Sequence, residues 1–183
     1  MISFLKGKMM GKYVMLVLMS CMMIGSMSGC GVAQRAEYLG NELRSDDKYA
    51  EELFQFITEA LEREDKEALK SIFSSYTLEN SDNLDEQMDK LMEFYPGYDG
   101  GYDVSIHTHG SSSYGGKEYI LCPQYCITND GFEYRIWLIA YIENENESEK
   151  IGLYSIQVMT EEAKPEGFKW RTEDDAPGIY VLE

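Results

Sequence analysis

Apolar residues along the chain recur first with the period of a helix and later with the period of a strand. Between residues 46 and 61 they recur at i, i+3, i+4 and i+7, which predicts an amphipathic helix. Its apolar stripe consists of Ala50, Leu53, Phe54, Ile57, Ala60 and Leu61. Ser45 is a suitable N-cap, and Asp46 and Asp47 place negative charge at the positive end of the helix dipole.

Two shorter helices are expected next. Asp65 can cap the first, whose apolar side consists of Ala68, Leu69, Ile72 and Phe73. The second begins at Ser81 or Asp82, and its apolar face consists of Leu84, Met88, Leu91 and Met92. It ends before Pro96 and Gly97, because neither residue continues a helix well.

The second half of the chain has the two-residue period of antiparallel strands. Strands are expected at residues 102–109, 117–128, 132–143 and 151–160. A Gly/Ser-rich loop is expected at 110–116 and a polar turn at 144–150. In the tail that follows, Trp170 and residues 179–181 are candidate core anchors.

A hairpin is predicted at the sequence Asn-Asp-Gly, residues 129–131. With Asp130 and Gly131 as the turn residues, three facing pairs bring one apolar side together: Ile127 with Tyr134, Tyr125 with Ile136, and Leu121 with Ala140. Helices followed by antiparallel strands predict an α+β fold, in which three helices cover one face of a curved four-stranded antiparallel sheet.

The N-terminus has the organisation of a secretory signal peptide. Lys6, Lys8 and Lys12 precede an apolar run over residues 13–25, which is shorter than the roughly 20 residues that span a membrane. The following Ser-Met-Ser-Gly-Cys, residues 26–30, resembles a bacterial lipobox, although Met27 stands where leucine is usual. The alternatives are an ordinary signal peptide cut elsewhere and an uncleaved anchor.

The lipobox resemblance implies cleavage between Gly29 and Cys30, and lipid attachment at Cys30 that includes fatty acyl chains such as palmitate. Two or three acyl chains on one residue anchor a protein stably, whereas one binds only marginally. The expected organisation is therefore a signal peptide at 1–29, a lipidated tether at 30–45 and a single α+β domain at 46–183. The expected location is the extracytoplasmic face of the cell membrane.

The chain is strongly acidic, with a formal net charge of −17 over 183 residues. This charge argues against a nucleic-acid partner, because phosphate binding needs clustered Lys and Arg. It also disfavours acidic polymers as ligands. An aromatic content of 13% argues against a disordered acidic tail.

Two cysteines remain for the domain, since Cys21 lies in the leader and Cys30 is the lipid site. An extracytoplasmic location permits a disulfide between Cys122 and Cys126. Four residues of regular strand span about 13 Å, however, and bridged Cα atoms lie roughly 4.4–6.8 Å apart. A disulfide therefore requires a bulge or turn at Pro123, and the pattern favours two free, mostly buried thiols over it.

Two further groups of residues are candidates for function. Asp103, His107 and His109 share a strand face and could begin a metal or acid–base site, although the first two would be about 13 Å apart along a regular strand. The alternative is a solvated strand face. Tyr98, Tyr102 and Tyr114 lie beside glycines and form a candidate ligand or partner surface; the alternative is a loop packed on the sheet edge.

The element order is similar to that of the nuclear-transport-factor-two-like superfamily, also called cystatin-like. More narrowly, the chain resembles an uncharacterised family of lipoproteins from Gram-positive bacteria, known only as a domain of unknown function. The resemblance rests on the lipobox at Cys30, the pair Phe54 and Ile57, and the segments 65–73, 152–156 and 177–180. It covers residues 46–183.

The superfamily resemblance implies that an enzyme of this fold would use a pocket-facing Asp or His as a base. The ionisable residues of the predicted strands include Glu133, Glu143 and Arg135. Neither glutamate is flanked by apolar neighbours on the same strand face, as a base with a shifted pKa would require. We therefore expect a non-catalytic binding or interaction module at the cell envelope, without a cofactor or metal. Its expected partners are the membrane, through the lipid anchor, and an unknown protein or small-molecule ligand. The alternative function is a small-molecule isomerase or cyclase with a base in the cone-shaped pocket.

Overall fold

The computed structural model describes residues 45–97, 101–113 and 116–182, which belong to one compact unit, Leu39–Glu183. The predicted signal peptide, the lipid site Cys30 and the tether up to residue 44 lie outside the described residues. Tyr98 and Tyr114 also lie outside them. Among the described residues, no helix combines the length and the apolar character needed to cross a membrane.

Four helices precede the sheet: α3 (Asp46–Glu62), α4 (Lys66–Lys70), α5 (Ser75–Asn80) and α6 (Leu84–Phe94). The predicted caps are confirmed, because the Ser45 and Asp65 side chains accept hydrogen bonds from the Lys48 and Ala68 amides. The predicted stripe of α3 is buried throughout. Helix α5 was not expected; its N-cap Ser74 accepts from the Thr77 amide.

The last helix starts later than the sequence predicts. Its N-cap is Asn83 rather than Ser81 or Asp82, and Asn83 adopts the left-handed conformation with φ of 54°. Asparagine tolerates that conformation better than most residues. The sequence predicted three helices before the sheet, and the structure has a fourth, α5. It was missed because the polar sequence of α5 has no apolar stripe.

The strands form one sheet in the order β1 (Tyr102–Ser113), β2 (Gly116–Asn129), β3 (Phe132–Asn144), β4 (Gly152–Thr160) and β5 (Gly178–Leu182). A short 3₁₀ helix, η1 (Ser148–Lys150), lies between β3 and β4. All three predicted hairpin pairs between β2 and β3 are confirmed. The turn residues Asp130 and Gly131 have φ of 51° and 82°, as a type I′ turn requires.

The sheet departs from the predicted four-stranded meander at two places. Residues 110–113 extend β1 instead of forming a loop, because the backbone ladder with β2 continues through Gly110 to Ser113 whatever the side chains. The tail supplies a fifth strand, and β5 pairs with β4 in parallel. A short apolar run does not reveal its direction, so the sequence indicated only a core anchor there.

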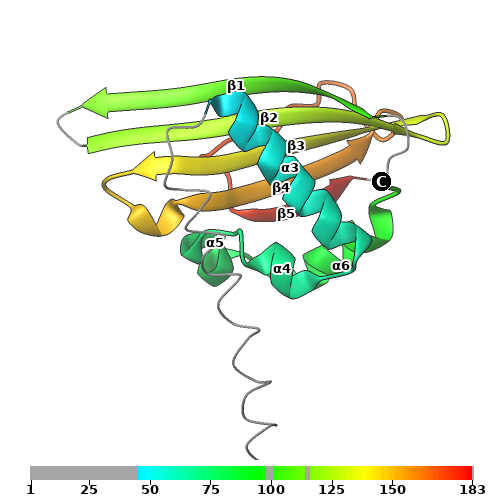
Figure 1. Cartoon of the computed structure of the whole chain (residues 1–183), viewed down its shortest axis with the longest axis horizontal. Coiled ribbons are helices and arrows are strands. Elements are labelled where there is room, and N and C mark those ends of the chain that lie inside the picture. The colour runs from blue at the N-terminus through cyan, green and yellow to red at the C-terminus, as the bar shows by residue number, and fades with distance from the viewer. Residues whose placement is uncertain (1–44, 98–100, 114–115, 183) are drawn as a thin grey trace, which may run out of the picture. The chain divides into compact units, whose positions relative to one another are not determined.

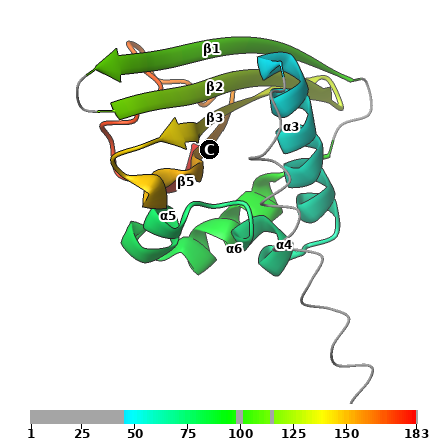
Figure 2. The same cartoon turned by 60° about the vertical axis from the view of Figure 1, so that its left-hand side comes forward.

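The sheet is curved, unclosed and mostly antiparallel, and the helices lie on its concave side (Figures 1 and 2). Irregularities in the ladder at Tyr119/Ile120 and Ile139/Ala140 mark bulges, which increase local bending. The core between helices and sheet includes Leu53, Phe54, Ile57, Met88, Leu91, Leu121, Tyr125, Leu138, Ile156 and Ile179.

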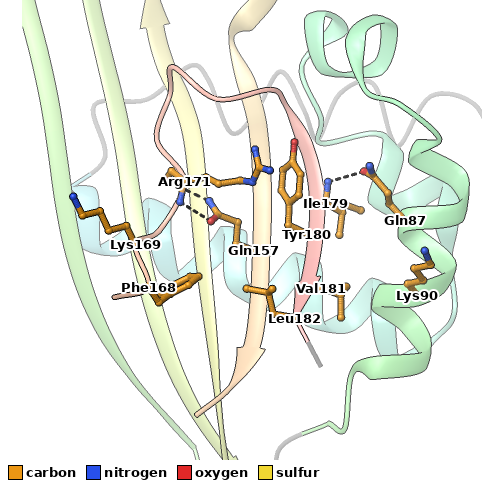
Figure 3. Close-up of a pocket in the computed structure, with 10 residues that line it drawn as sticks. All are labelled: Gln87, Lys90, Gln157, Phe168, Lys169, Arg171, Ile179, Tyr180, Val181 and Leu182. Atoms are coloured by element: carbon orange, nitrogen blue, oxygen red, sulfur yellow. Dashed lines mark hydrogen bonds between the residues drawn. The ribbon is translucent and has the colours of Figure 1, made fainter. Parts of the chain in front are cut away.

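The opposite, outer face of the sheet is also covered. Residues 161–177, hereafter the crossover segment, connect β4 to the parallel strand β5 across this face (Figure 3). A second apolar cluster adjoins the crossover segment. It comprises Ile120, Cys122, Ile139, Tyr141 and Tyr154, with Trp137 and Tyr76 at its margin. Strand β4 is buried at every position from 153 to 159 because it is covered on both faces.

Candidate binding groove

The crossover segment is held against the sheet by an aromatic stack and by paired hydrogen bonds. Trp170 stacks on Trp137 of β3, with ring centroids 5.8 Å apart and planes inclined by 10°. The buried side chain of Gln157 accepts from the Arg171 amide at 2.8 Å and donates to the Arg171 carbonyl at 3.4 Å. Gln157 thus satisfies both backbone groups of Arg171, as a neighbouring strand would.

Further contacts fix the second half of the crossover segment. The Tyr154 hydroxyl donates to the Asp175 carbonyl at 2.9 Å. The Asp175 carboxylate accepts from the Thr172 amide at 2.8 Å. The Tyr180 hydroxyl donates to the Ala176 carbonyl at 2.7 Å. The segment is therefore an ordered wall beside β5.

Between this wall, β5 and α6 lies a groove of about 420 Å³ (Figure 3). It is lined by Gln87, Lys90, Gln157, Phe168, Lys169, Arg171, Ile179, Tyr180, Val181 and Leu182. The lining combines three cationic side chains and two amides with apolar and aromatic groups, and it includes no acid. The chain as a whole has 16 basic and 33 acidic residues, so a lining whose charged side chains are all basic departs from the general composition.

The cations of the groove differ in their contacts. The Arg171 guanidinium lies 3.8 Å from the centre of the Tyr180 ring, and its Nη1 is 3.8 Å from an Asp175 carboxylate oxygen. The Lys90 ammonium is 3.2 Å from the Glu86 carboxylate. Among the basic residues in the described part of the chain, Lys169 is the one without an ion pair. In Figure 3 it points away from β5.

Burial also affects the groove's phenol. Desolvation raises the pKa of Tyr180, although the neighbouring Arg171 cation acts in the opposite direction. Tyr180 is therefore a neutral hydrogen-bonding group at physiological pH. The cation–π contact uses its ring face and leaves its hydroxyl for the carbonyls of Ala176 and Pro177.

The core on the concave side presents no base in the part of the chain that the structure describes. Among all the described residues, the buried polar ones are Thr58, Ser74, Thr77, Asn144, Ser155 and Gln157, and none is an acid or a histidine. Phe54, Ile57 and Met88 are fully buried. Tyr125 stacks on Phe54 at 4.3 Å, and its hydroxyl donates to the Ala50 carbonyl at 2.6 Å. The isomerase or cyclase alternative gains no support from this interior.

The predicted tyrosine surface is not assembled by the described residues. Tyr102 is half-buried, and its ring lies 4.4 Å from Phe54 and 5.8 Å from Tyr125. It packs on the core rather than forming an open platform. Tyr98 and Tyr114, the other two members of the predicted surface, lie outside the described residues.

Asp103, His107 and His109 of β1 share one face of the strand, as predicted, and this is the outer face of the sheet. All three side chains are exposed. His109 lies 3.6 Å from the Glu173 carboxylate, and the His107 ring is 5.6 Å from Trp137. Within residues 45–97, 101–113 and 116–182, no group of three His, Cys, Asp or Glu side chains is placed to hold a metal ion. The geometry favours the solvated strand face over a metal site.

Cys122 and Cys126 are free thiols on the outer face of β2, and strand β2 runs through both without a turn at Pro123. Cys122 is buried and Cys126 half-buried. Burial raises the pKa of Cys122 to about 12, and the Glu173 carboxylate contributes to the same shift. A thiol with so high a pKa is a poor nucleophile.

Comparison with known families gives a match. Residues 55–161 match the model of a domain of unknown function, DUF5104. The chain belongs to the DUF5104 family. A search of the curated proteins found no match to the chain.

The DUF5104 match covers the C-terminal half of α3, the other helices and strands β1 to β4. Of the groove lining, Gln87, Lys90 and Gln157 lie within the match, whereas Arg171 and Tyr180 lie beyond it. Sequence reasoning did not find the groove. The alternation of aromatic and basic residues in Phe-Lys-Trp-Arg, residues 168–171, was the available signal for it.

Proposed function

We propose that the protein is a lipid-anchored binding module on the extracytoplasmic face of a bacterial cell membrane, and that its groove takes an organic anion with an apolar body. The observation that supports this binding site is the lining of the groove, which contains Lys90, Lys169 and Arg171 and no acid, although the chain has a net charge of −17. The lipobox sequence ending at Cys30 supports the anchor. The partner is not a nucleic acid, given the acidic remainder of the chain.

The order of elements and the curved sheet also support assignment of the domain to the nuclear-transport-factor-two-like, or cystatin-like, superfamily. We treat this fold assignment as part of the proposal. Domains with this architecture enclose a concave side between helices and sheet. In this chain that side is filled by Phe54, Ile57, Met88 and Tyr125, so we propose the groove at the β5 edge of the sheet as the binding site instead.

The chemistry of the groove suits a carboxylate attached to a ring or an alkyl body. A planar guanidinium can donate two parallel hydrogen bonds to a carboxylate, and Arg171 is already oriented by the Tyr180 ring and by Gln157. Phe168, Val181 and Leu182 supply apolar contact area. The volume of about 420 Å³ lies within the range of small-molecule sites.

The test is a calorimetric titration of the full chain with naphthalene-2-carboxylate. The neutral alcohol 2-naphthalenemethanol serves as the reference ligand, because it has the same apolar body without the charge. We expect saturable binding of the carboxylate and at least tenfold weaker binding of the alcohol, which corresponds to about 1.4 kcal/mol. Hydrogen exchange should slow in residues 161–182 when the carboxylate binds.

Matched variants separate the groove from general effects. Arg171→Gln and Lys90→Gln should each weaken carboxylate binding several-fold, whereas Lys48→Gln on α3, which removes an exposed lysine far from the groove lining, should leave it unchanged. Equal effects of the three variants, or equal affinity for the acid and the alcohol, would contradict the anion site. The anchor is tested separately, through Cys30.

A further inference from the structure

Strand β1 forms an open edge of the sheet. It is the outermost strand in Figures 1 and 2, and no described element lies beyond it. Its 12 residues pair with β2 in continuous register, without a bulge. On an edge strand, alternate backbone N–H and C=O groups point away from the neighbouring strand. Outside the ladder with β2, none of the described hydrogen bonds uses a backbone group of residues 103–109.

The other edge of the sheet is closed. Helix α6 lies beside β5, and the Gln87 side chain accepts a hydrogen bond from the Ile179 amide at 2.8 Å. Proteins usually protect an exposed edge with lysine, proline, a bulge or a covering element. The sequence of β1, Tyr-Asp-Val-Ser-Ile-His-Thr-His-Gly-Ser-Ser-Ser, contains no lysine, arginine or proline. Among the described residues, therefore, one edge of the sheet is protected and the other has no covering element.

We infer that the β1 edge pairs with the β1 edge of a second copy of this chain, antiparallel about a two-fold axis at Ser105. In this register Val104 of one copy faces Ile106 of the other on the concave side, and Asp103 faces His107 on the outer side. An imidazole N–H can donate to a carboxylate. The two copies would form one continuous sheet.

The sequence of β1 is self-complementary in this register. Val104 is 45% exposed in the single chain, and pairing covers it with another branched apolar side chain. Because the two-fold repeats every contact, each apolar pair and each acid–imidazole pair occurs twice.

Neighbouring registers are less complementary. With the axis at Ile106, Val104 faces Thr108, and His107 faces Ser105 instead of Asp103. With the axis at His107, the two imidazoles face each other. His109 is already beside Glu173 within its own chain, at 3.6 Å, so His107 is the more available partner for Asp103. Two acidic chains repel each other, and added salt should therefore strengthen the dimer by screening that repulsion.

Disulfide trapping tests both the dimer and its register. Facing Cα atoms in an antiparallel pair are about 4.5–5.5 Å apart, which is within disulfide range. In the full chain with Cys126→Ser, which removes the half-buried native thiol on the same face, Ser105→Cys should form a disulfide-linked dimer on mild oxidation. Thr108→Cys is the matched control, because Thr108 is exposed on the same strand but faces Tyr102 of the other copy.

A second pair of variants tests the dimer without a cross-link. Val104→Lys places a charge in the interface and should leave only monomer in light scattering, whereas Val104→Thr should retain the dimer. Cross-linking of Ser105→Cys no faster than Thr108→Cys, with the unaltered chain monomeric at about 0.1 mM, would overturn the inference. Faster cross-linking through Ile106→Cys than through Ser105→Cys would overturn the proposed register.

Discussion

Trp170 of the crossover segment and Trp137 of β3 are stacked nearly in parallel, with 5.8 Å between ring centroids. His107 and Phe168 pack on the two ends of this pair, at 5.6 Å from Trp137 and 5.0 Å from Trp170. A segment without regular secondary structure is thereby held on the outer face of the sheet, and the groove depends on its position.

Replacement of Trp170 by alanine should loosen the crossover segment. An aromatic pair contributes about 0.5–1.5 kcal/mol beyond its buried area, so a loss of about 2 kcal/mol in the free energy of unfolding is expected for this half-buried ring. Urea denaturation measures the loss. Trp170→Phe keeps a ring on Trp137 and should recover more than half of it; equal losses for both variants would contradict a role for stacking.

Gly152→Ala should be among the more damaging small substitutions. Gly152 has φ of 122°, and a Cβ there would lie 3.0 Å from the Ser74 amide nitrogen and 3.2 Å from the Ile72 carbonyl oxygen. These are backbone atoms of a segment that pairs with Leu153, so they cannot move aside cheaply. We expect a loss of about 3 kcal/mol in unfolding free energy.

Gly167→Ala is the matched control for that substitution. Gly167 also has positive φ, of 74°, but a Cβ there meets nothing within 4 Å. Its cost should be about 1 kcal/mol, from backbone strain alone. Thermal or urea unfolding measures both variants: Gly167→Ala reports backbone strain alone, and Gly152→Ala reports strain together with a steric clash. Equal costs would contradict the close approach of Gly152 to residues 72–74.

The domain should lose stability as the solution becomes alkaline. Burial raises the pKa of Cys122 and of Tyr154 to about 12, and it also raises the pKa values of Tyr125 and Tyr141. In the unfolded chain these groups lose their protons near their ordinary pKa values of about 8.5 for cysteine and 10 for tyrosine. The unfolded state therefore binds fewer protons, and the free energy of unfolding falls as pH rises above about 9.

Urea midpoints between pH 8 and pH 11 measure this dependence. Tyr141→Phe should flatten the slope, because it removes one of the phenols that ionise only on unfolding. Phenolate absorbance provides an independent check. Complete ionisation of the tyrosines near pH 10 in the folded protein would show that burial does not shift them.

Cys30→Ala should abolish membrane anchoring if the lipobox is used. In a Gram-positive host, the unaltered chain should incorporate labelled palmitate and partition into detergent, and the variant should do neither. Cys122→Ala is the control, since that thiol is buried in the folded domain. Labelling that persists in the Cys30 variant would contradict the lipid site.

The sequence predicted those parts of the fold that depend on local patterns. The structure confirms the apolar stripe of α3, its Ser45 cap and the register of the β2–β3 hairpin. Each of these features is determined by residues that lie close together in the sequence. Helix α5 was missed because its burial rests on Thr77, a polar residue whose hydroxyl lies within hydrogen-bonding distance of the Leu153 and Tyr154 carbonyls.

The groove could not be predicted in the same way. It brings together Lys90 of α6, Gln157 of β4, Arg171 of the crossover segment and Tyr180 of β5, which are distant in the sequence. Their meeting depends on the parallel pairing of β5, and a five-residue apolar strand carries no local sign of its partner or direction. The tyrosines beside glycines, by contrast, were visible in the sequence and predicted a binding surface. Tyr102 instead packs on Phe54 of the core.

The hydrogen bond from the Ile179 amide to Gln87 joins residues 92 positions apart. Contacts of such separation reward the chain only after a long loop has been closed, so they are expected to form late in folding. Strand β5 and the crossover segment therefore constitute a unit that is expected to join the body of helices and meander late in folding. A ligand in the groove would slow the opening of that unit, and the occupied module would resist proteases at sites where the empty one is cut.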